Sequence, residues 1–197
     1  MSRLLEKVIV KEYLYPLFTH ASYTEQFADQ FAFRPTGSTT SAIIQLTHTV
    51  SEMLGTKPKL PYVHVISLDF SKALDTGRHH SLTSKLANLP LPDLVFNWIV
   101  EYLNGRVHCT KFNNIISSLT SINSSIIQGS GLGPATNNIT AHDLHPVSSG
   151  NVMVKYADDT YLLVPSTNTG TIQTELDHIQ HWSTCNNLSQ KHPGSYG

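Results

Sequence analysis

Three aspartates occupy positions from which carboxylates could act together on a metal ion. Asp69 ends a strand-like apolar run, and Asp158 with Asp159 joins two further strand-like runs, which predicts a hairpin with these two residues at its tip. Three ionised carboxylates gathered among apolar residues would repel one another, and a divalent cation such as Mg²⁺, which prefers hard oxygen ligands, offsets that cost. Two such ions ~4 Å apart can hold the attacking and the leaving oxygen of an in-line phosphoryl transfer.

Each of these features has a simpler explanation when it is taken alone. An Asp-Asp pair in a turn is usually only a turn-forming pair, and an aspartate after an apolar strand is usually a cap. The glycine-rich run Gln128–Gly131 would by itself be a loop. The order of the three features along one chain is what favours a shared catalytic site.

The hydrophobic pattern predicts the elements that must position the aspartates. A nearly continuous β-branched and apolar run at 62–68 is typical of a strand that is buried on both faces. Helical spacing and terminal turn formers predict helices at 4–18, 39–54, 81–89, 92–104, 132–144 and 171–187. Further strands are expected at 107–112, 119–127, 152–157 and 160–164. Strands and helices alternate without a strict βαβ rhythm, so the predicted fold class is α+β.

Two details of these helices depend on single residues. The first helix is expected to end near Pro16, because proline lacks the N–H that a helix interior needs. In the helix that Ser38 or Thr39 caps and Gly55 stops, the predicted buried stripe is Ile43, Leu46, Val50, Met53 and Leu54.

Composition and charge narrow the class of protein. The chain has 197 residues, 40% hydrophobic and 14% charged, which is ordinary for a globular protein. No apolar stretch approaches the ~20 residues of a membrane helix, and charges interrupt the opening MSRLLEKVIV, so we expect an intracellular protein of the nucleus or cytoplasm with no membrane partner. Thirteen Lys+Arg against fourteen Asp+Glu argue mildly against a nucleic-acid-binding protein, which usually carries a basic surplus.

Five segments carry a resemblance to a known family. They are Gln30–Thr40, Leu68–Thr76, Asn97–Arg106, Gln128–Pro134 and Tyr156–Thr160. These segments resemble conserved segments of reverse transcriptases from non-LTR (LINE-type) retrotransposons. Taken in the same order, they correspond to the block before the catalytic strand, motif A, the linking helix, motif B and motif C. The resemblance covers residues 1–188.

The resemblance implies a right-hand polymerase palm with partial fingers, in which helices back a small, mostly antiparallel sheet. It implies an RNA-directed DNA polymerase that uses an RNA template, a DNA primer, deoxynucleoside triphosphates and two divalent ions, Mg²⁺ or Mn²⁺. Asp69, Asp158 and Asp159 would be the catalytic residues. Asp69 and Asp158 would bind the metals, with the backbone carbonyl of Phe70 as a further ligand, and Asp159 would complete the carboxylate cluster.

The same resemblance assigns residues to the nucleotide and the nucleic acid. Leu74 stands where the family keeps a bulky ring beneath the sugar of the incoming nucleotide, so discrimination against ribonucleotides is left open. Gln128 and Gly129 would lie beside the templating base pair, with the glycine permitting close approach of the nucleic acid backbone. Lys72 would contact a phosphate; the alternative is that Lys72 is simply a solvated surface residue. Arg34 would bind nucleic acid.

The match departs from the family's pattern in ways that bear on activity. Gly77 and Ile127 stand where the family usually has a β-branched residue and a proline, and Thr136–Asn138 is unusual after Pro134. Residues 1–188 correspond to a fingers/palm fragment without a thumb or endonuclease, and residues 189–197 are expected to be an unstructured tail. We therefore expect the palm of a truncated polymerase. The alternative is a non-catalytic remnant of a retroelement that binds nucleic acid or protein, and the sequence leaves the oligomeric state open.

Overall fold

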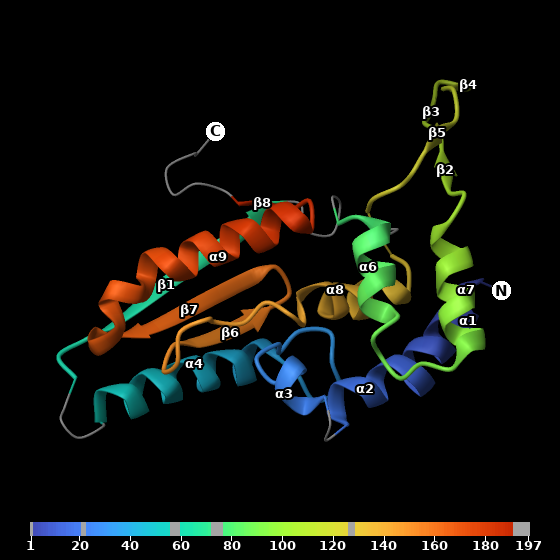
Figure 1. Ribbon diagram of the computed structural model, residues 1–197. Coiled ribbons are helices and arrows are strands. Elements are labelled where there is room, and N and C mark those ends of the chain that lie inside the picture. Colours follow the sequence, from blue (N-terminus) through green and yellow to red (C-terminus); the bar gives the residue numbers. More distant parts are fainter. Residues whose placement is uncertain (1, 21–22, 56–59, 72–76, 126–128, 191–197) are drawn as a thin grey trace.

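A four-stranded sheet carries the three aspartates (Figure 1). In the computed structural model, which describes residues 2–20, 23–55, 60–71, 77–125 and 129–190, its strand order is β6-β7-β1-β8. The strands are β1 (Val63–Ser71), β6 (Val152–Tyr156), β7 (Asp159–Pro165) and β8 (Ser189–Gln190). Each neighbouring pair is antiparallel, which confirms the predicted kind of sheet.

Two helices enclose the sheet, one on each face (Figure 1). Helix α4 (Thr39–Gly55) packs through Leu46, Val50 and Met53 on the face that presents Val154 and Leu163. Helix α9 (Ile172–Cys185) follows the 3-10 helix η2 (Ser166–Thr171) and covers the opposite face, where Ile179 and Trp182 meet apolar side chains of β1, β6 and β7. Alternate residues of each strand thus contact different helices.

The remaining helices share a separate apolar core beside the sheet. They are α1 (Ser2–Ile9), the π-helix η1 (Val10–Leu14), α2 (Tyr15–Thr19), α3 (Thr24–Phe27), α6 (His79–Leu86), α7 (Asp93–Leu103) and α8 (Leu132–Ala141). Its fully buried members include Leu14, Leu86, Ile99 and Ile139. Among the described residues, no helix combines the length and apolar character needed to cross a bilayer.

The predicted end of the first helix at Pro16 is wrong, because the chain changes helix type instead of leaving the helix. The N–H of Tyr15 donates to Val10 O, the wider spacing of a π-helix, and α2 begins at Tyr15. Pro16 then lies in the first turn of α2, where its fixed φ suits the helix.

The prediction that β1 is buried on both faces is also wrong. Leu68 and Phe70 are buried beneath α9, but Val65 is 48% exposed and Ser67 and Asp69 on the same face are exposed as well. On this face of β1, Val63 packs in the apolar cluster that contains α4 side chains. The uncovered part leaves an accessible surface at the end of the sheet that carries Asp69.

Two residues of the predicted apolar stripe of α4 are exposed to solvent instead of facing the sheet. Ile43 is 57% exposed and Leu54 is 37% exposed, whereas Ala42 is buried against the sheet. Leu46, Val50 and Met53 face the sheet as predicted. The buried stripe is therefore narrower than the hydrophobic pattern of the helix.

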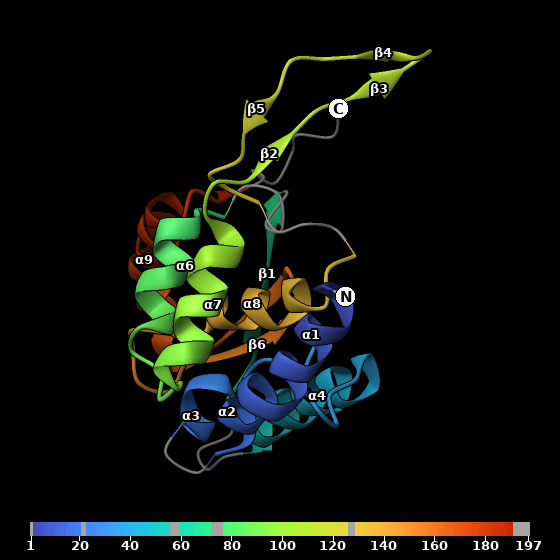
Figure 2. The same ribbon diagram turned by 90° about the vertical axis from the view of Figure 1, so that its right-hand side faces the viewer.

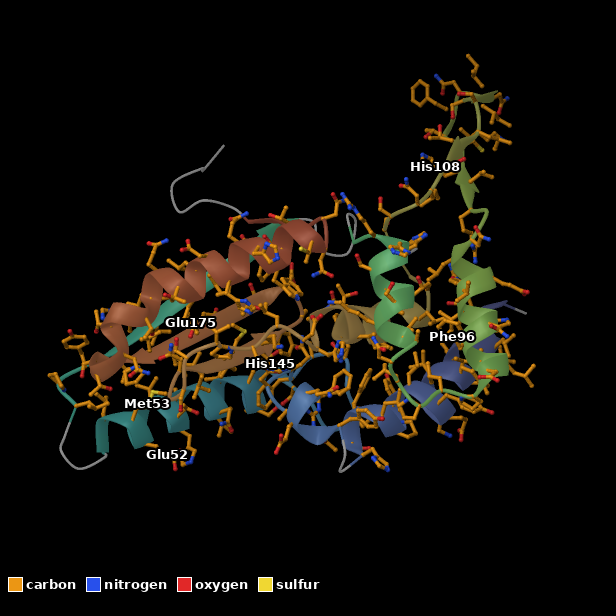
Figure 3. All side chains as sticks on the ribbon, viewed as in Figure 1. Glu52, Met53, Phe96, His108, His145 and Glu175 are labelled. Atoms are coloured by element: carbon orange, nitrogen blue, oxygen red, sulfur yellow. The ribbon has the colours of Figure 1, made fainter. Side chains whose placement is uncertain are left out.

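A long two-stranded ribbon projects away from the rest of the chain (Figure 2). It contains β2 (Val107–His108), β3 (Lys111–Phe112), β4 (Ile115–Ile116) and β5 (Thr120–Ser121), paired β2 with β5 and β3 with β4. His108 marks its stem in Figure 3. The predicted strands at 107–112 and 119–127 thus contribute to the two arms of one ribbon, and every residue of 107–121 is exposed.

The predicted tail has structure at its start. Ser189 and Gln190 form β8 opposite Ser71 and Phe70, so no structural boundary separates them from residue 188. The rest of the predicted tail, 191–197, lies outside the described residues.

Candidate active site

Asp69 and Asp159 lie directly opposite each other on β1 and β7. Residues opposite each other in an antiparallel pair point to the same face, with Cβ atoms roughly 4.5–5.5 Å apart. Asp158 directly precedes Asp159, in the two-residue turn Ala157–Asp158 between β6 and β7. The hairpin tip is therefore one residue earlier than predicted, and the fold brings all three aspartates to the same end of the sheet.

The electrostatics of Asp159 reflect this proximity. Partial burial raises the pKa of the Asp159 carboxyl, and the negative charges of Asp158 and Asp69 raise it further. All three residues are exposed, although Asp158 also lines a small cavity together with Phe70, Leu144 and Trp182. Partial desolvation and repulsion among like charges are both costs that a cation would offset here.

The turn before Asp158 has an unusual backbone. Ala157 has φ +57°, in the left-handed region that residues with a Cβ seldom adopt. A positive φ at the first turn position is typical of the primed turns that close two-residue hairpins. The direction of the Asp158 side chain therefore depends on an alanine held in a strained conformation.

Sequence reasoning missed a buried lysine behind this hairpin. Lys155 is 1% exposed, and its Nζ donates to the carbonyls of Ala141 and Leu144, at 2.8 Å each. Nζ also pairs with Asp29 Oδ2 at 3.0 Å, and His145 Nδ1 lies 3.3 Å from the same oxygen. Burial lowers the pKa of Lys155, and Asp29 opposes that shift. The cation ties β6 to the C-terminal end of α8, where the helix dipole favours positive charge.

The predicted motif B segment forms the start of α8. Gly129 has φ +79°, and among the described residues a Cβ at this position would meet no atom within 4 Å, so backbone conformation rather than crowding favours glycine. Gly131 N donates to the carboxylate of Glu6 at 2.7 Å, and Glu6 is only 2% exposed. A carboxylate at a helix N-terminus is favourable, so this contact fixes the start of α8 against α1.

The unusual asparagines of this helix have different surroundings. Asn138 Nδ2 donates to Ala32 O at 2.9 Å and Phe33 O at 3.2 Å, which ties α8 to the preceding loop. Asn137 lines a small cavity behind the hairpin together with Asp158, and in the described part of the chain its Nδ2 has no hydrogen-bond partner.

The donors present fit a divalent cation in chemical type. Carboxylate oxygens are hard ligands, and Mg²⁺ usually takes one or two of them and completes its shell with waters and substrate phosphates. Across the residues that the structure describes, no group of three or more His, Cys, Asp or Glu side chains is arranged to hold a metal ion by itself. The three aspartates thus offer a partial ligand set, open to substrate.

The other predicted site residues have varied positions. The Phe70 ring packs against Trp182, with centroids 5.6 Å apart, and the role of its carbonyl stays a prediction. Arg34 Nη1 donates to Phe27 O at 2.8 Å and to Gln30 O at 3.2 Å. Lys72, Leu74 and Gln128 lie outside the described residues.

Comparison with known proteins identifies the family. The family model described as reverse transcriptase (RNA-dependent DNA polymerase) matches residues 1–192. The chain therefore belongs to the reverse transcriptase family.

Its curated relatives include RNA-directed DNA polymerases of mobile elements. It is 29% identical over 201 residues to the RNA-directed DNA polymerase from mobile element jockey of Drosophila funebris, an alignment that covers 96% of this chain and 21% of that protein. It is 28% identical over 134 residues to a probable RNA-directed DNA polymerase from transposon X-element of Drosophila melanogaster, covering 66% and 14%. The chain thus spans only 21% or less of the length of these relatives.

Solved structures show the same fold. Apo telomerase from Candida tropicalis gives a TM-score of 0.73 at 12% identity, covering 98% of this chain and 36% of that chain. Telomerase from Candida albicans with a fragment of telomeric RNA gives 0.68 at 12% identity, covering 100% and 35%. The predicted α+β, palm-like architecture is confirmed.

Proposed function

We propose that this chain supplies the palm of an RNA-directed DNA polymerase, which adds deoxynucleotides to a DNA primer on an RNA template. The observation that carries the proposal is the register of β1 and β7, which sets Asp69 opposite Asp159 with Asp158 beside it. Carboxylates gathered on neighbouring strands, exposed to solvent and repelling one another, are typical of a site that binds cations together with phosphates.

Asp69 and Asp158 would hold two Mg²⁺ or Mn²⁺ ions, with the carbonyl of Phe70 as a further ligand and Asp159 completing the negative cluster. When bound, such ions stabilise charge on the attacking and leaving oxygens of a nucleotidyl transfer. The chain's own part is to keep the carboxylates at one end of a rigid sheet. The exposed face near Ser67 leaves access for the primer end and the triphosphate.

The nucleotide-binding roles are proposals of the same kind. Gly129 would permit close approach of the nucleic acid backbone, and its open surroundings support that role. Lys72 for phosphate, Leu74 beneath the sugar and Gln128 beside the templating pair rest on the resemblance of their motifs, as does nucleic acid contact by Arg34. Residues 1–188 would form the fingers/palm unit, acting in the nucleus or cytoplasm.

A primer-extension assay separates this function from that of a non-catalytic remnant. The purified chain is incubated with poly(rA)/oligo(dT), labelled dTTP and Mg²⁺ or Mn²⁺, beside the variant Asp158→Asn. Labelled product from the wild type and none from the variant supports the polymerase. Retention of the primer–template in a gel without extension by either protein would favour the binding remnant.

A further inference from the structure

The segment Asp29–Phe31 lies along β6, at the edge of the sheet, and carries a buried glutamine. Lys155 N donates to Asp29 O at 2.7 Å, and Phe31 N donates to Lys155 O at 2.9 Å. These bonds form a parallel bridge between Gln30 and Lys155. Gln30 is only 2% exposed, so its side-chain amide must find partners inside the protein.

The side chain of Gln30 continues this pairing toward the catalytic turn. Ala157 N donates to Gln30 Oε1 at 3.1 Å, and Gln30 Nε2 donates to Ala157 O in a longer bond of 3.4 Å. Oε1 also accepts from Ala32 N at 3.0 Å. Gln30 therefore engages both backbone groups of Ala157, as a neighbouring strand would.

The hydrogen bonds from Gln30 are important because Ala157 has an unfavourable backbone conformation. Its φ of +57° is unfavourable for a residue with a Cβ, so surrounding contacts must maintain it. Ala157 directly precedes Asp158. A change in its backbone angles would redirect Asp158 and shift the start of β7, where Asp159 lies.

We propose that Gln30 is a positioning residue of the carboxylate site, which holds Ala157 in its left-handed conformation, thereby directs Asp158 and the start of β7, and so sets the metal affinity of the site. The inference rests on the proposed function. Glutamine suits the role because it offers an acceptor and a donor without charge. An aliphatic side chain would leave the N–H groups of Ala157 and Ala32 without their acceptor.

The loop that carries Gln30 is itself anchored. Arg34 Nη1 donates to Gln30 O, and Asn138 Nδ2 from α8 donates to Ala32 O. These contacts hold the backbone on both sides of the Gln30 amide. Contacts from α8 and from within the loop therefore fix the position of Gln30, and Gln30 in turn restrains Ala157 in the turn.

Titration with Mn²⁺, followed by electron paramagnetic resonance, tests the effect on the site. Gln30→Met is expected to bind Mn²⁺ about tenfold more weakly than the wild type, the cost typical of losing a residue that orients a metal ligand. Gln30→Glu keeps the acceptor for both N–H groups and is expected to recover part of the affinity. Ile179→Val, on the buried face of α9, lowers stability without touching the turn, and its Mn²⁺ affinity should match the wild type.

Hydrogen exchange of the Ala157 amide, measured by NMR without metal, gives a second readout. Exchange about tenfold faster in Gln30→Met, with the rest of the sheet unchanged, is expected if the bond to Oε1 protects this amide. If Gln30→Met does not fold, Gln30→Asn, which keeps an uncharged amide on a side chain one methylene shorter, provides the same comparison with a smaller expected change.

The two readouts separate the inference from the function on which it rests. A folded Gln30→Met with wild-type Mn²⁺ affinity and wild-type Ala157 exchange would overturn the positioning role. Failure of the wild-type chain to bind Mn²⁺ would instead count against the proposed function, and the exchange of Ala157 would then decide by itself whether Gln30 holds the turn.

Discussion

Asp69 and Asp159 are cross-strand partners on β1 and β7, and hydrophobic packing sets the register that pairs them. Leu162 and Leu163 of β7 are completely buried, one against α9 and the other against α4. A slip of one residue would exchange these two side chains between the faces and move Asp159 away from Asp69. Packing on both faces of the sheet thus keeps the carboxylates together against their mutual repulsion.

The pKa of Asp159 is expected to depend on its acidic neighbours. Because the charges of Asp158 and Asp69 raise it, Asp158→Asn should lower the pKa of Asp159 toward the ordinary aspartate value. A pH titration of the side-chain carboxyl by ¹³C NMR measures the shift. Asp177→Asn on α9 is the control, and an Asp159 pKa that is equal in wild type and Asp158→Asn would contradict the proximity of these charges.

The same shift predicts how stability depends on pH. A group whose folded pKa is raised contributes stability that is present below its unfolded pKa, here 3.8, and is lost as the pH rises through the folded value. At pH 7 Asp159→Asn should therefore stabilise the fold, by less than about 1 kcal/mol because the group is exposed. Urea unfolding at pH 3 and pH 7 measures the difference, which should shrink at pH 3.

Glu175 is expected to be important for stability rather than for catalysis. This fully buried residue of α9 accepts hydrogen bonds from Val147 N at 3.0 Å, Ser148 N at 2.8 Å and Asn151 Nδ2 at 2.8 Å. Burial opposes its ionisation, but these bonds outweigh it and lower the pKa of Glu175. Glu175→Gln should cost about 2 kcal/mol at pH 7, because charge-assisted bonds are lost.

The cost of Glu175→Gln should depend on pH. Since the folded pKa of Glu175 is depressed, its contribution is present above the unfolded pKa of 4.5 and is lost as the pH falls through the folded value. Denaturant unfolding at pH 7 and pH 3 tests this. Glu52→Gln is the matched control, since Glu52 is exposed on α4 with His48 as its ion-pair partner (Figure 3). An equal loss in the two variants would refute the role of Glu175.

Lys155 and Asp29 are expected to act as a pair. Lys155→Met leaves the Asp29 carboxylate in a largely enclosed site without its cation, a change that typically costs ~3–5 kcal/mol. The double variant Asp29→Leu/Lys155→Met should recover much of that loss, because no unpaired charge remains. A thermodynamic cycle of the two single variants and the double variant measures the coupling, and additive losses would show that the two residues do not depend on each other.

The sequence predicts the proximity of the three aspartates, but it does not predict the contacts that support them. Asp69, Asp158 and Asp159 can be predicted because each has a recognisable segment around it, and strand patterns on both sides bring them to one sheet. Gln30, Lys155 and Glu175 act through partners that are distant in the sequence. Gln30 and Ala157, for example, are 127 positions apart. A single sequence contains no signal for such pairings.

The errors in the fold have physical causes as well. Apolar periodicity predicts a buried Ile43 and a doubly buried β1, but it does not specify how far α4 extends over the sheet. Pro16 predicts the end of a helix only if the helix keeps α-helical hydrogen-bond spacing. The π-helix at Val10–Leu14 does not keep that spacing, so the prediction fails. Local pattern thus identifies the elements, while tertiary packing decides which of their faces are covered.

The central claim is that the aspartates of β1 and of the β6–β7 hairpin form one cation site. Isothermal titration of Mn²⁺ into the wild type, Asp69→Asn, Asp158→Asn and the α9 control Asp177→Asn tests it most directly. The account predicts saturable binding to the wild type and the control, and affinity at least about tenfold weaker in each of the other two variants. Equal Mn²⁺ affinity in all four proteins would contradict it.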